Sequence, residues 1–260
     1  DWLTPYKLDE QLTEVDNKAV ALSFSGYILA LGIILWGVLS TDSSITPTGS
    51  MSRDLIANLV DTAIWGGIGI VLLQIARLIN DKILLYQFNN TKELVEDQNV
   101  GTGAVQCGTY IGSAFIIRAS LSGEATESFL VSLTSTLVFF ILGQLAFILF
   151  SKLYQIVSRY DLHGEIEKDN VAAGVSFGMT LTAVGIVLSG YILRSDSIVG
   201  LALWFVFSAF LLLVLRYVVD KLLLPGKILD EEISQDRNWG AALVEGSAAL
   251  GLALILTAAF

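Results

Sequence analysis

The chain contains few residues that carry metal or redox chemistry. Only one of its 260 residues is a cysteine, Cys107, and only one is a histidine, His163. No disulfide can therefore form within one chain, and neither a thiolate zinc cage nor a site with two histidine ligands can be built from it. The first residues are polar and acidic, unlike a retained signal peptide. We expect no metal and no cofactor.

Charged residues, and positive charge in particular, are also scarce. They make up 15% of the chain, and 15 lysines and arginines stand against 25 acidic residues, which gives a net charge of −10. Nucleic acid is therefore not an expected partner, because binding to phosphates needs clustered basic side chains. By contrast, 54% of the residues are hydrophobic and the mean hydropathy is +0.68. These values are typical of proteins that cross the lipid bilayer several times.

Seven apolar runs are long enough to cross the hydrocarbon core of a bilayer. They predict an all-α membrane protein with seven transmembrane helices. The alternating pattern of membrane β-strands is absent, so a barrel is not expected. The predicted spans are 19–39, 55–79, 100–119, 129–150, 171–193, 198–219 and 241–260.

The positive charges are distributed unequally between the connections. Those after the first, third and fifth spans hold only Arg53, Arg118 and Arg194, whereas the other 12 of the 15 cations lie in the N-terminal segment and near the remaining connections. By the positive-inside rule the second group is cytoplasmic. We therefore expect a bacterial inner-membrane protein with a cytoplasmic N-terminus and an external C-terminus.

Four short polar stretches, each ending in an asparagine, precede the first, third, fifth and seventh spans. Carboxylates and asparagine accept hydrogen bonds from the free amides of a first helical turn, which predicts helix caps. An alternative is that the acids surround a pore mouth or dock a basic cytoplasmic protein. The candidate residues are Glu14, Asp16, Asn17, Glu96, Asn99, Glu167, Asp169, Asn170, Asp236 and Asn238.

The same stretches mark an internal repeat. Aligning Asn17 with Asn170 matches Ala30–Leu35 with Ala183–Leu188. Aligning Asn99 with Asn238 matches four further positions, namely Gly101, Val105, Gln106 and Gly112 with Gly240, Val244, Glu245 and Gly251. We interpret the chain as two parallel copies of a four-helix unit, each made of two hairpins, with the last helix of the second copy missing. The two offsets, 153 and 139, differ by 14 residues, which we place in the loop from Ser40 to Arg53. The chain is thus predicted to consist of an N-terminal cytoplasmic segment (1–16), a first four-helix membrane unit (17–154), a cytoplasmic linker (155–169) and a second membrane unit with three helices (170–260).

This arrangement resembles the DUF350 family, also called UPF0719. The resemblance covers nearly the whole chain and rests on Asp16-Asn17, Glu96 with Asn99, Asp169-Asn170 and the glycines that follow them. It implies a small bacterial integral membrane protein without an assigned activity, and some members are similar to proteins encoded beside envelope-stress or polyamine-related genes. The chain departs from the pattern at Arg237 and Gln235.

Two charged pairs stand near the ends of the second and sixth spans. Arg77 with Asp81, and Arg216 with Asp220, have the four-residue spacing at which side chains on one helix can form an ion pair. The simpler interpretation, which we favour, is an arginine that extends along the helix to anchor its end at the lipid headgroups.

Glu245 is the strongest single candidate for a functional residue. It follows Asn238 by seven residues, which places it about 10 Å into the seventh span, where a carboxylate usually faces protein or water. Gln106 has the same position in the first copy, and Asp61 is a weaker candidate in the second span. Such a carboxyl suits a proton or cation site, and the alternative is a hydrogen bond that joins helices.

We therefore expect a protein that is not an enzyme and acts as an ion or small-solute channel or transport component, or as a membrane subunit of a larger assembly. An envelope-stress scaffold that docks cytoplasmic partners is an alternative, and an intramembrane enzyme is the least favoured one. The expected partners are the lipid bilayer and other membrane subunits, either copies of this chain or different proteins. The missing helix favours an assembly, because an uncovered apolar face must contact lipid or another helix.

Overall fold

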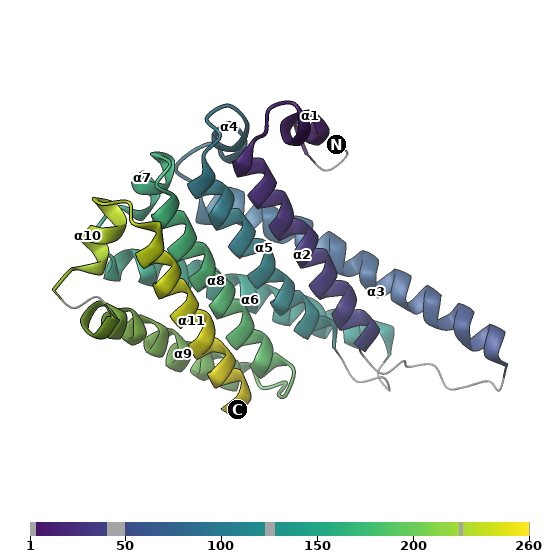
Figure 1. The fold of residues 1–260 in the computed structure, drawn as a ribbon. Helices are drawn as coiled ribbons and strands as arrows, with labels where there is room; N and C mark the ends of the chain where they lie inside the picture. The colour runs from purple at the N-terminus through teal and green to yellow at the C-terminus, as the bar shows by residue number, and fades with distance from the viewer. Residues whose placement is uncertain (1–3, 41–49, 123–127, 224–225, 260) are drawn as a thin grey trace.

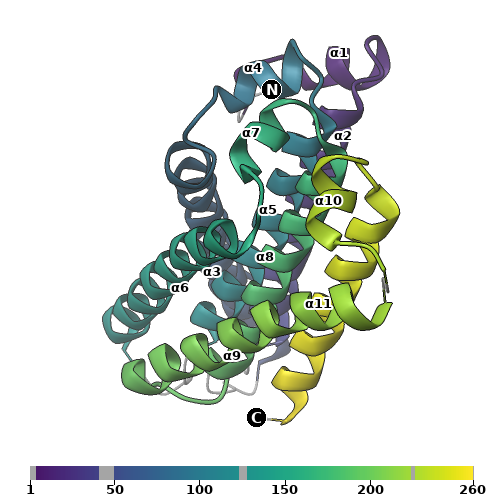
Figure 2. The same ribbon diagram turned by 90° about the vertical axis from the view of Figure 1, so that its left-hand side faces the viewer.

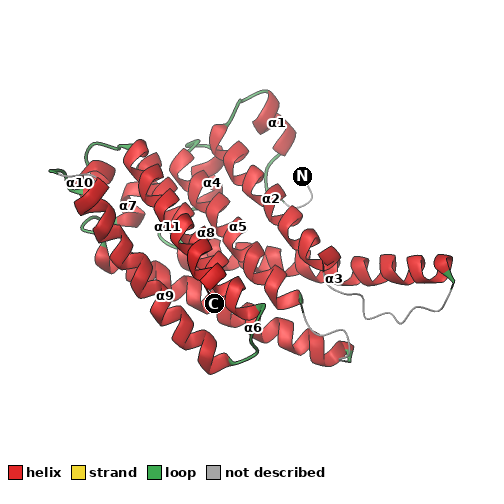
Figure 3. Cartoon of the chain, turned by 60° about the horizontal axis from the view of Figure 1, so that its bottom comes forward, coloured by secondary structure: helices red, strands yellow, loops and turns green. Residues whose placement is uncertain are grey.

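The described residues of the computed structural model, 4–40, 50–122, 128–223 and 226–259, form helices joined by short loops (Figure 3). Seven of these helices are long and apolar enough to cross a membrane, so the predicted all-α membrane fold and its seven spans are confirmed for the described residues. The long helices are α2 (Lys18–Ser40), α3 (Met51–Ile79), α5 (Val100–Leu121), α6 (Phe129–Val157), α8 (Val171–Ile192), α9 (Ile198–Val218) and α11 (Trp239–Ala259).

Four of the long helices form an inner row in the order α2, α5, α8, α11, with each helix packed against the next (Figure 1). Small residues allow this close packing. The clearest case is the contact between α5 and α8, where a Cβ added at Gly108 would overlap the backbone of Gly178. The same holds for Gly174 against Gly101 and for Gly185 against Gly112.

The other three long helices, α3, α6 and α9, form an outer layer that crosses the inner row at an angle (Figure 2). Each one packs on two neighbouring inner helices: α3 on α2 and α5, α6 on α5 and α8, and α9 on α8 and α11. Their outward faces carry exposed apolar side chains such as Leu203, Val206 and Phe210. A lipid environment accounts for such faces, because the hydrocarbon is as apolar as these side chains.

Four short helices, which we call the lead-in helices, precede the four inner helices at one end of the molecule (Figure 1). They are α1 (Leu8–Thr13), α4 (Asn90–Val95), α7 (Leu162–Glu167) and α10 (Leu229–Ser234). The C-terminus lies at the opposite end (Figure 1). The inner helices therefore all run in one direction, away from the lead-in helices.

A π-helical turn directly follows α3, and another directly follows α9. They are η1 (Asn80–Leu84) and η2 (Val219–Leu223), and their positions differ by 139 residues, which is the offset expected between equivalent positions. A π-turn at both places favours the interpretation of α3 and α9 as copies of one element.

The placement of the 14 extra residues is only partly correct. Residues 41–49 lie outside the described residues, but α3 has 29 residues where its counterpart α9 has 21. Because 29 − 21 = 8, the predicted repeat alignment puts part of the extra length in the helix and not only in the loop. The first half of α3 projects beyond α2 (Figures 1 and 3) and exposes Leu55, Ile56 and Leu59.

Candidate functional site

Each of the four asparagines caps the inner helix that follows it. Its Oδ1 accepts a hydrogen bond from the amide three residues later, at Val20, Thr102, Ala173 and Ala241, over 2.8–3.2 Å. The residue before each asparagine turns the chain with a positive φ of 48–55°, at Asp16, Gln98, Asp169 and Arg237. The predicted asparagine caps are confirmed. Asp16 and Asp169 form the turn before their own helices, and Asp169 Oδ1 also accepts a hydrogen bond at 3.2 Å from the amide of Gly101 in the first turn of α5.

The amide nitrogens of the first three asparagines also link their inner helices to the next lead-in helix. Nδ2 of Asn17 donates to the carbonyl of Leu94 in α4 at 2.8 Å, and Asn99 donates to Ile166 in α7 at 2.7 Å. Asn170 likewise donates to Ile233 in α10 at 2.9 Å. The three asparagines are 0–1% exposed. They therefore tie the inner helices and the lead-in helices into one row at this end of the molecule.

The acids that contact the asparagines are not the predicted ones. Nδ2 of Asn99, Asn170 and Asn238 donates to Glu93, Glu165 and Glu232, respectively, over 2.7–3.0 Å. Gln11 has this role for Asn17. The predicted acids are exposed instead, at or just after the ends of the four lead-in helices; they are Glu14, Glu96, Glu167 and Asp236.

Two glutamates of this hydrogen-bond system, Glu93 at the second position of the row and Glu232 at its last, differ in electrostatics. Burial raises the pKa of the Glu93 carboxyl, and the hydrogen bond from Asn99 opposes this effect only in part. The hydrogen bond from Asn238 lowers the pKa of Glu232, with help from Lys227. Glutamates at corresponding places therefore have pKa values that move in opposite directions, because desolvation and the nearby acids Asp97 and Glu167 raise the pKa of Glu93, whereas the hydrogen bond from Asn238 and the nearby Lys227 lower that of Glu232.

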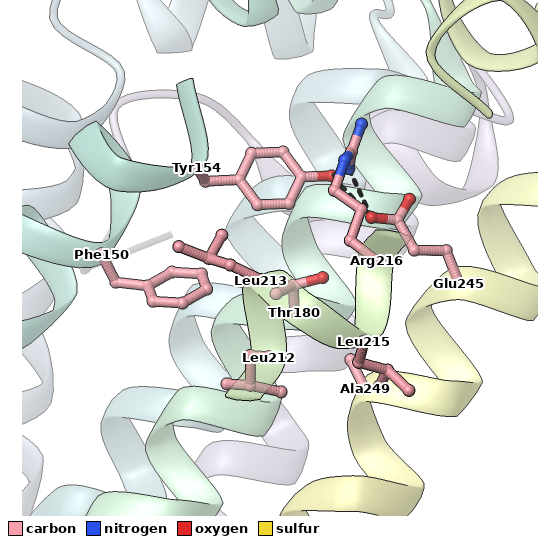
Figure 4. Close-up of a pocket in the computed structure, with 9 residues that line it drawn as sticks. All are labelled: Phe150, Tyr154, Thr180, Leu212, Leu213, Leu215, Arg216, Glu245 and Ala249. Carbon is pink, nitrogen blue, oxygen red and sulfur yellow. Dashed lines mark hydrogen bonds and ion pairs between the residues drawn. The ribbon is translucent and has the colours of Figure 1, made fainter. Parts of the chain in front are cut away.

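Glu245 lies in a buried cluster of charged and hydroxyl side chains between α6, α8, α9 and α11 (Figure 4). One of its oxygens accepts hydrogen bonds from Arg216 of α9 and, at 3.3 Å, from Tyr154 of α6. The other accepts from the Ser176 hydroxyl of α8 at 2.5 Å. The side chain of Glu245 is 4% exposed. This one carboxylate therefore joins helices of both layers.

Arg216 is shared between two carboxylates. Its Nη1 donates to Glu245 and to Tyr154, and its Nη2 donates to Asp230 of the lead-in helix α10. Its guanidinium also lies 4.7 Å from the centroid of the Tyr154 ring. One cation thus contacts two carboxyl groups in the cluster. Asp230 is 15% exposed, so the cluster reaches from the membrane span toward the lead-in end.

The cavity beside this cluster is small. Its volume is about 10 Å³, and Phe150, Thr180, Leu212, Leu213, Leu215 and Ala249 complete the lining. This space suffices for no more than about one water molecule. The cluster is therefore closed in this conformation, and any movement of a solute past it requires a displacement of α9 or α11.

Gln106 occupies the equivalent place in the first copy, with neutral chemistry. It accepts a hydrogen bond from Ser23 at 2.6 Å, as Glu245 does from Ser176, and it donates to Asp81 at 3.2 Å. Asp81 also accepts from Asn90 and lies 3.9 Å from Nε of Arg77. The predicted pair of Arg77 and Asp81 is thus present in the structure.

The other predicted pair is not formed. Arg216 binds Glu245 and Asp230 in place of Asp220, and Asp220 accepts from the backbone amide of Leu229 at 2.7 Å. The interpretation of Arg216 as an exposed anchor at the headgroups is also wrong, because the residue is only 6% exposed. Arg216 therefore pairs with acids from α10 and α11, and not with the acid four residues further along its own segment.

Asp61 does not join either cluster. It lies on α3, which packs against α2, α5 and α6, and not on a helix that contributes to the cluster around Glu245. No hydrogen bond or ion pair of Asp61 is present among the described residues. Its side chain is half-buried. The three predicted intramembrane candidates are therefore at three separate places.

Three residues of the site, Tyr154, Ser176 and Asp230, were not predicted. The repeat contained a signal for Ser176, because it aligns with Ser23. Both serines follow their capping asparagine by six residues, and Gln106 and Glu245 follow theirs by seven, so all four side chains lie at nearly the same depth. No pattern marks Tyr154 or Asp230, which come from elements distant in sequence. Within the described ranges, histidine, cysteine and acidic side chains form no cluster of three or more that could hold a metal ion.

Comparison with known proteins relates the chain to uncharacterised membrane proteins. The family model described as Domain of Unknown Function (DUF350) matches residues 1–121 and 128–260. A UPF0719 transmembrane protein of Aquifex aeolicus is 24% identical over 97% of this chain and 89% of its own length. The UPF0719 transmembrane protein YshE of Bacillus subtilis is 25% identical over 44% of this chain and 84% of its own length. No solved structure matches.

Proposed function

Since the chain belongs to the DUF350 family, whose description assigns no activity, we propose from its buried cluster that it is a proton-dependent transport component of the bacterial cytoplasmic membrane. Glu245 is the group that takes up and releases the proton. The observation that carries this proposal is the ion pair between Arg216 and Glu245, which lies inside two membrane spans. Ionisable groups at such positions are costly and most often functional.

The shared arginine supplies a way for protonation to change the structure. While Glu245 is ionised, Arg216 holds α9 and α11 together through it and also binds Asp230. Protonation removes the charge of Glu245 and with it most of the attraction, since a neutral carboxyl does not balance a buried guanidinium. Arg216 then keeps Asp230 as its only charged partner. The contact between α9 and α11 is loosened, and the closed cavity can open.

The position of Arg216 favours such a movement. It stands three residues before the π-turn η2, where the regular helical hydrogen-bond pattern of α9 changes. Turns of this kind are frequent at functional sites. The outer helix α9 is also largely exposed to lipid, whereas α8 beneath it is largely buried. A displacement of α9 therefore disturbs less packing than a displacement within the inner row.

The same cluster supports a role other than enzyme catalysis. An intramembrane enzyme would need a free base beside a nucleophile. The available hydroxyls are those of Ser176 and Tyr154, but the carboxylate next to them already accepts hydrogen bonds from both hydroxyls and from Arg216. Glu245 is thus better placed to exchange a proton together with a change in its ion pair than to activate a hydroxyl.

A second candidate function is a membrane scaffold that docks a cytoplasmic protein. It is supported by the exposed acids on the lead-in end, which lie on one face of the molecule (Figure 1). A basic partner would complement them, and the docking would weaken with salt. The distribution of cations supports a cytoplasmic location of this end and of the N-terminus.

Reconstitution in liposomes that contain a pH-sensitive dye tests the transport proposal. We expect the wild-type protein to conduct protons, alone or with a co-transported solute, and Glu245→Gln to abolish the flux. Glu232→Gln is the matched control, because it is the same substitution in a glutamate that also accepts a hydrogen bond but lies outside the spans. Equal flux through wild type and Glu245→Gln would overturn the proposal.

A further inference from the structure

The two inner helices at the ends of the row carry small residues that are exposed or half-buried. On α11 these residues are Gly240, Ser247 and Gly251, and on α2 they are Ala21, Ser25 and Gly32. A Cβ added at Gly251 or Gly32 would meet no atom within 4 Å. Such positions on inner helices contrast with the tightly packed glycines of α5 and α8.

These positions are the repeat equivalents of a contact that exists within the chain. The α11 positions follow those of α5 by 139 residues, and the α2 positions precede those of α8 by 153, which are the two offsets of the repeat. The free surface of α11 thus corresponds to the α5 surface that packs on α8, and that of α2 to the α8 surface that packs on α5. The corresponding residues are Gly101, Gly108 and Gly112 on α5, and Gly174, Gly178 and Gly185 on α8.

The hydrogen bonds from the asparagines to the next lead-in helix also stop at α11 and at α1, the two ends of the row. Asn17, Asn99 and Asn170 each donate to a carbonyl of the next lead-in helix, whereas Asn238, which is exposed, donates among the described residues only to its own Glu232. At the other edge, Leu12 of α1 has the same five-residue spacing from its asparagine as Leu94, whose carbonyl accepts from Asn17. A donor therefore stands at one edge and the matching acceptor position at the other.

We propose that copies of this protein associate head to tail, with α11 of one copy packed against α2 of the next as α5 packs against α8. Asn238 then donates to the Leu12 carbonyl of the neighbour and continues the row of links. The projecting half of α3, with its exposed Leu55, Ile56 and Leu59, extends past α2 on the side away from α5 (Figure 1) and lies over the neighbour's α11. Because the two surfaces differ, the contact forms closed rings or open chains.

This association is independent of the transport proposal, and three glycine variants test it. Gly251→Leu and Gly32→Leu each fill one of the two free surfaces, and the single chain has room for both side chains. Gly67→Leu is the matched control, since Gly67 is an equally open glycine on the outer helix α3. We expect wild type and Gly67→Leu to be oligomers in mild detergent and in liposomes by mass measurement, and the other two to be monomers. A monomeric wild type overturns the proposal.

Cross-linking locates the contact. In a Cys107→Ala background we would mix two single variants, Ser25→Cys and Ser247→Cys, whose positions correspond to Gly178 and Gly108. We expect a covalent dimer under mild oxidation from the mixture. Ser25→Cys mixed with Leu203→Cys, which lies on the exposed face of α9, should give none. Equal dimer yield from both mixtures, or oligomers without a cross-link from the first, would contradict the head-to-tail contact.

Discussion

Arg216 on α9 and Glu245 on α11 form an ion pair in which the two side chains are 7% and 4% exposed. The first half of the chain has no equivalent link among its described residues, because Gln106 stands at the position of Glu245 and Arg77 pairs with Asp81 on its own helix. One charged contact between the two layers therefore distinguishes the second half of the molecule from the first.

Removing Arg216 should destabilise the protein far more than removing Arg77. Arg216→Ala leaves two acids, one of them deeply buried, without their cation, and breaking a buried pair in this way costs about 3–5 kcal/mol. The Arg77 and Asp81 side chains are 19% and 24% exposed at a distance of 3.9 Å, so Arg77→Ala should cost less. Thermal unfolding in one detergent compares the two. Equal losses would show that the cluster does not hold α9 to α11.

Replacing a buried asparagine of the row should destabilise the protein more than replacing the exposed one at its edge. Asn170→Ala removes a helix cap and a buried donor to the carbonyl of Ile233, and such losses cost about 1–3 kcal/mol. Asn238→Ala removes a cap at the exposed edge and should cost less in the monomer. Unfolding with denaturant in micelles measures the difference. A larger effect at Asn238 in a monomeric preparation would contradict the described row of links.

Glycines of the inner row should be sensitive even to one methyl group. Gly108→Ala forces α5 away from the Gly178 backbone and lowers the unfolding temperature. Gly67→Ala has open space at the same kind of helical position and should be neutral or stabilising by about 0.5–1 kcal/mol. Similar destabilisation by both would mean that helix propensity, and not the contact between α5 and α8, decides the result.

The lead-in glutamates should respond to pH in opposite ways. The folded-state pKa of Glu232 is lowered, so its contribution to stability is present above the ordinary pKa of about 4.3 and is lost as the pH falls through the folded value. The pKa of Glu93 is raised, so its contribution is present below the ordinary pKa and is lost as the pH rises through the folded value.

Matched glutamine variants test this pair. Relative to wild type, Glu232→Gln should lose stability as the pH rises through the lowered folded pKa up to the ordinary value of about 4.3, whereas Glu93→Gln should gain stability as the pH rises from that ordinary value through the raised folded pKa. Unfolding measured in one detergent across this pH range gives both slopes. If the stability difference from wild type changed with pH in the same direction for both variants, the pKa of Glu93 would not be raised while that of Glu232 is lowered.

The spans and the caps could be predicted from the sequence because both depend on neighbouring residues. Length and hydropathy define a membrane helix, and Asn99 caps a helix that begins at the next residue. The repeat also placed Gln106 and Glu245 at one depth, and the structure gives each a serine partner, Ser23 and Ser176. These features need no knowledge of how distant helices pack.

The composition of the charged cluster could not be predicted in this way. Spacing along α9 favoured Asp220 as the partner of Arg216, but the chosen partners, Asp230 and Glu245, are 14 and 29 residues away. Tyr154 reaches the cluster from α6, 62 residues before Arg216. Which of several acids binds an arginine depends on the crossing of the two layers, and this crossing is not encoded in any local pattern.

The most direct test of the account is an infrared difference spectrum of the reconstituted protein between neutral and acidic pH. If Glu245 takes up the proton, the carbonyl band of a buried protonated carboxyl group appears on acidification in wild type and in Glu232→Gln, and it is absent in Glu245→Gln. A band that persists in folded Glu245→Gln at full intensity would contradict the central claim, because the protonated group would then be another residue.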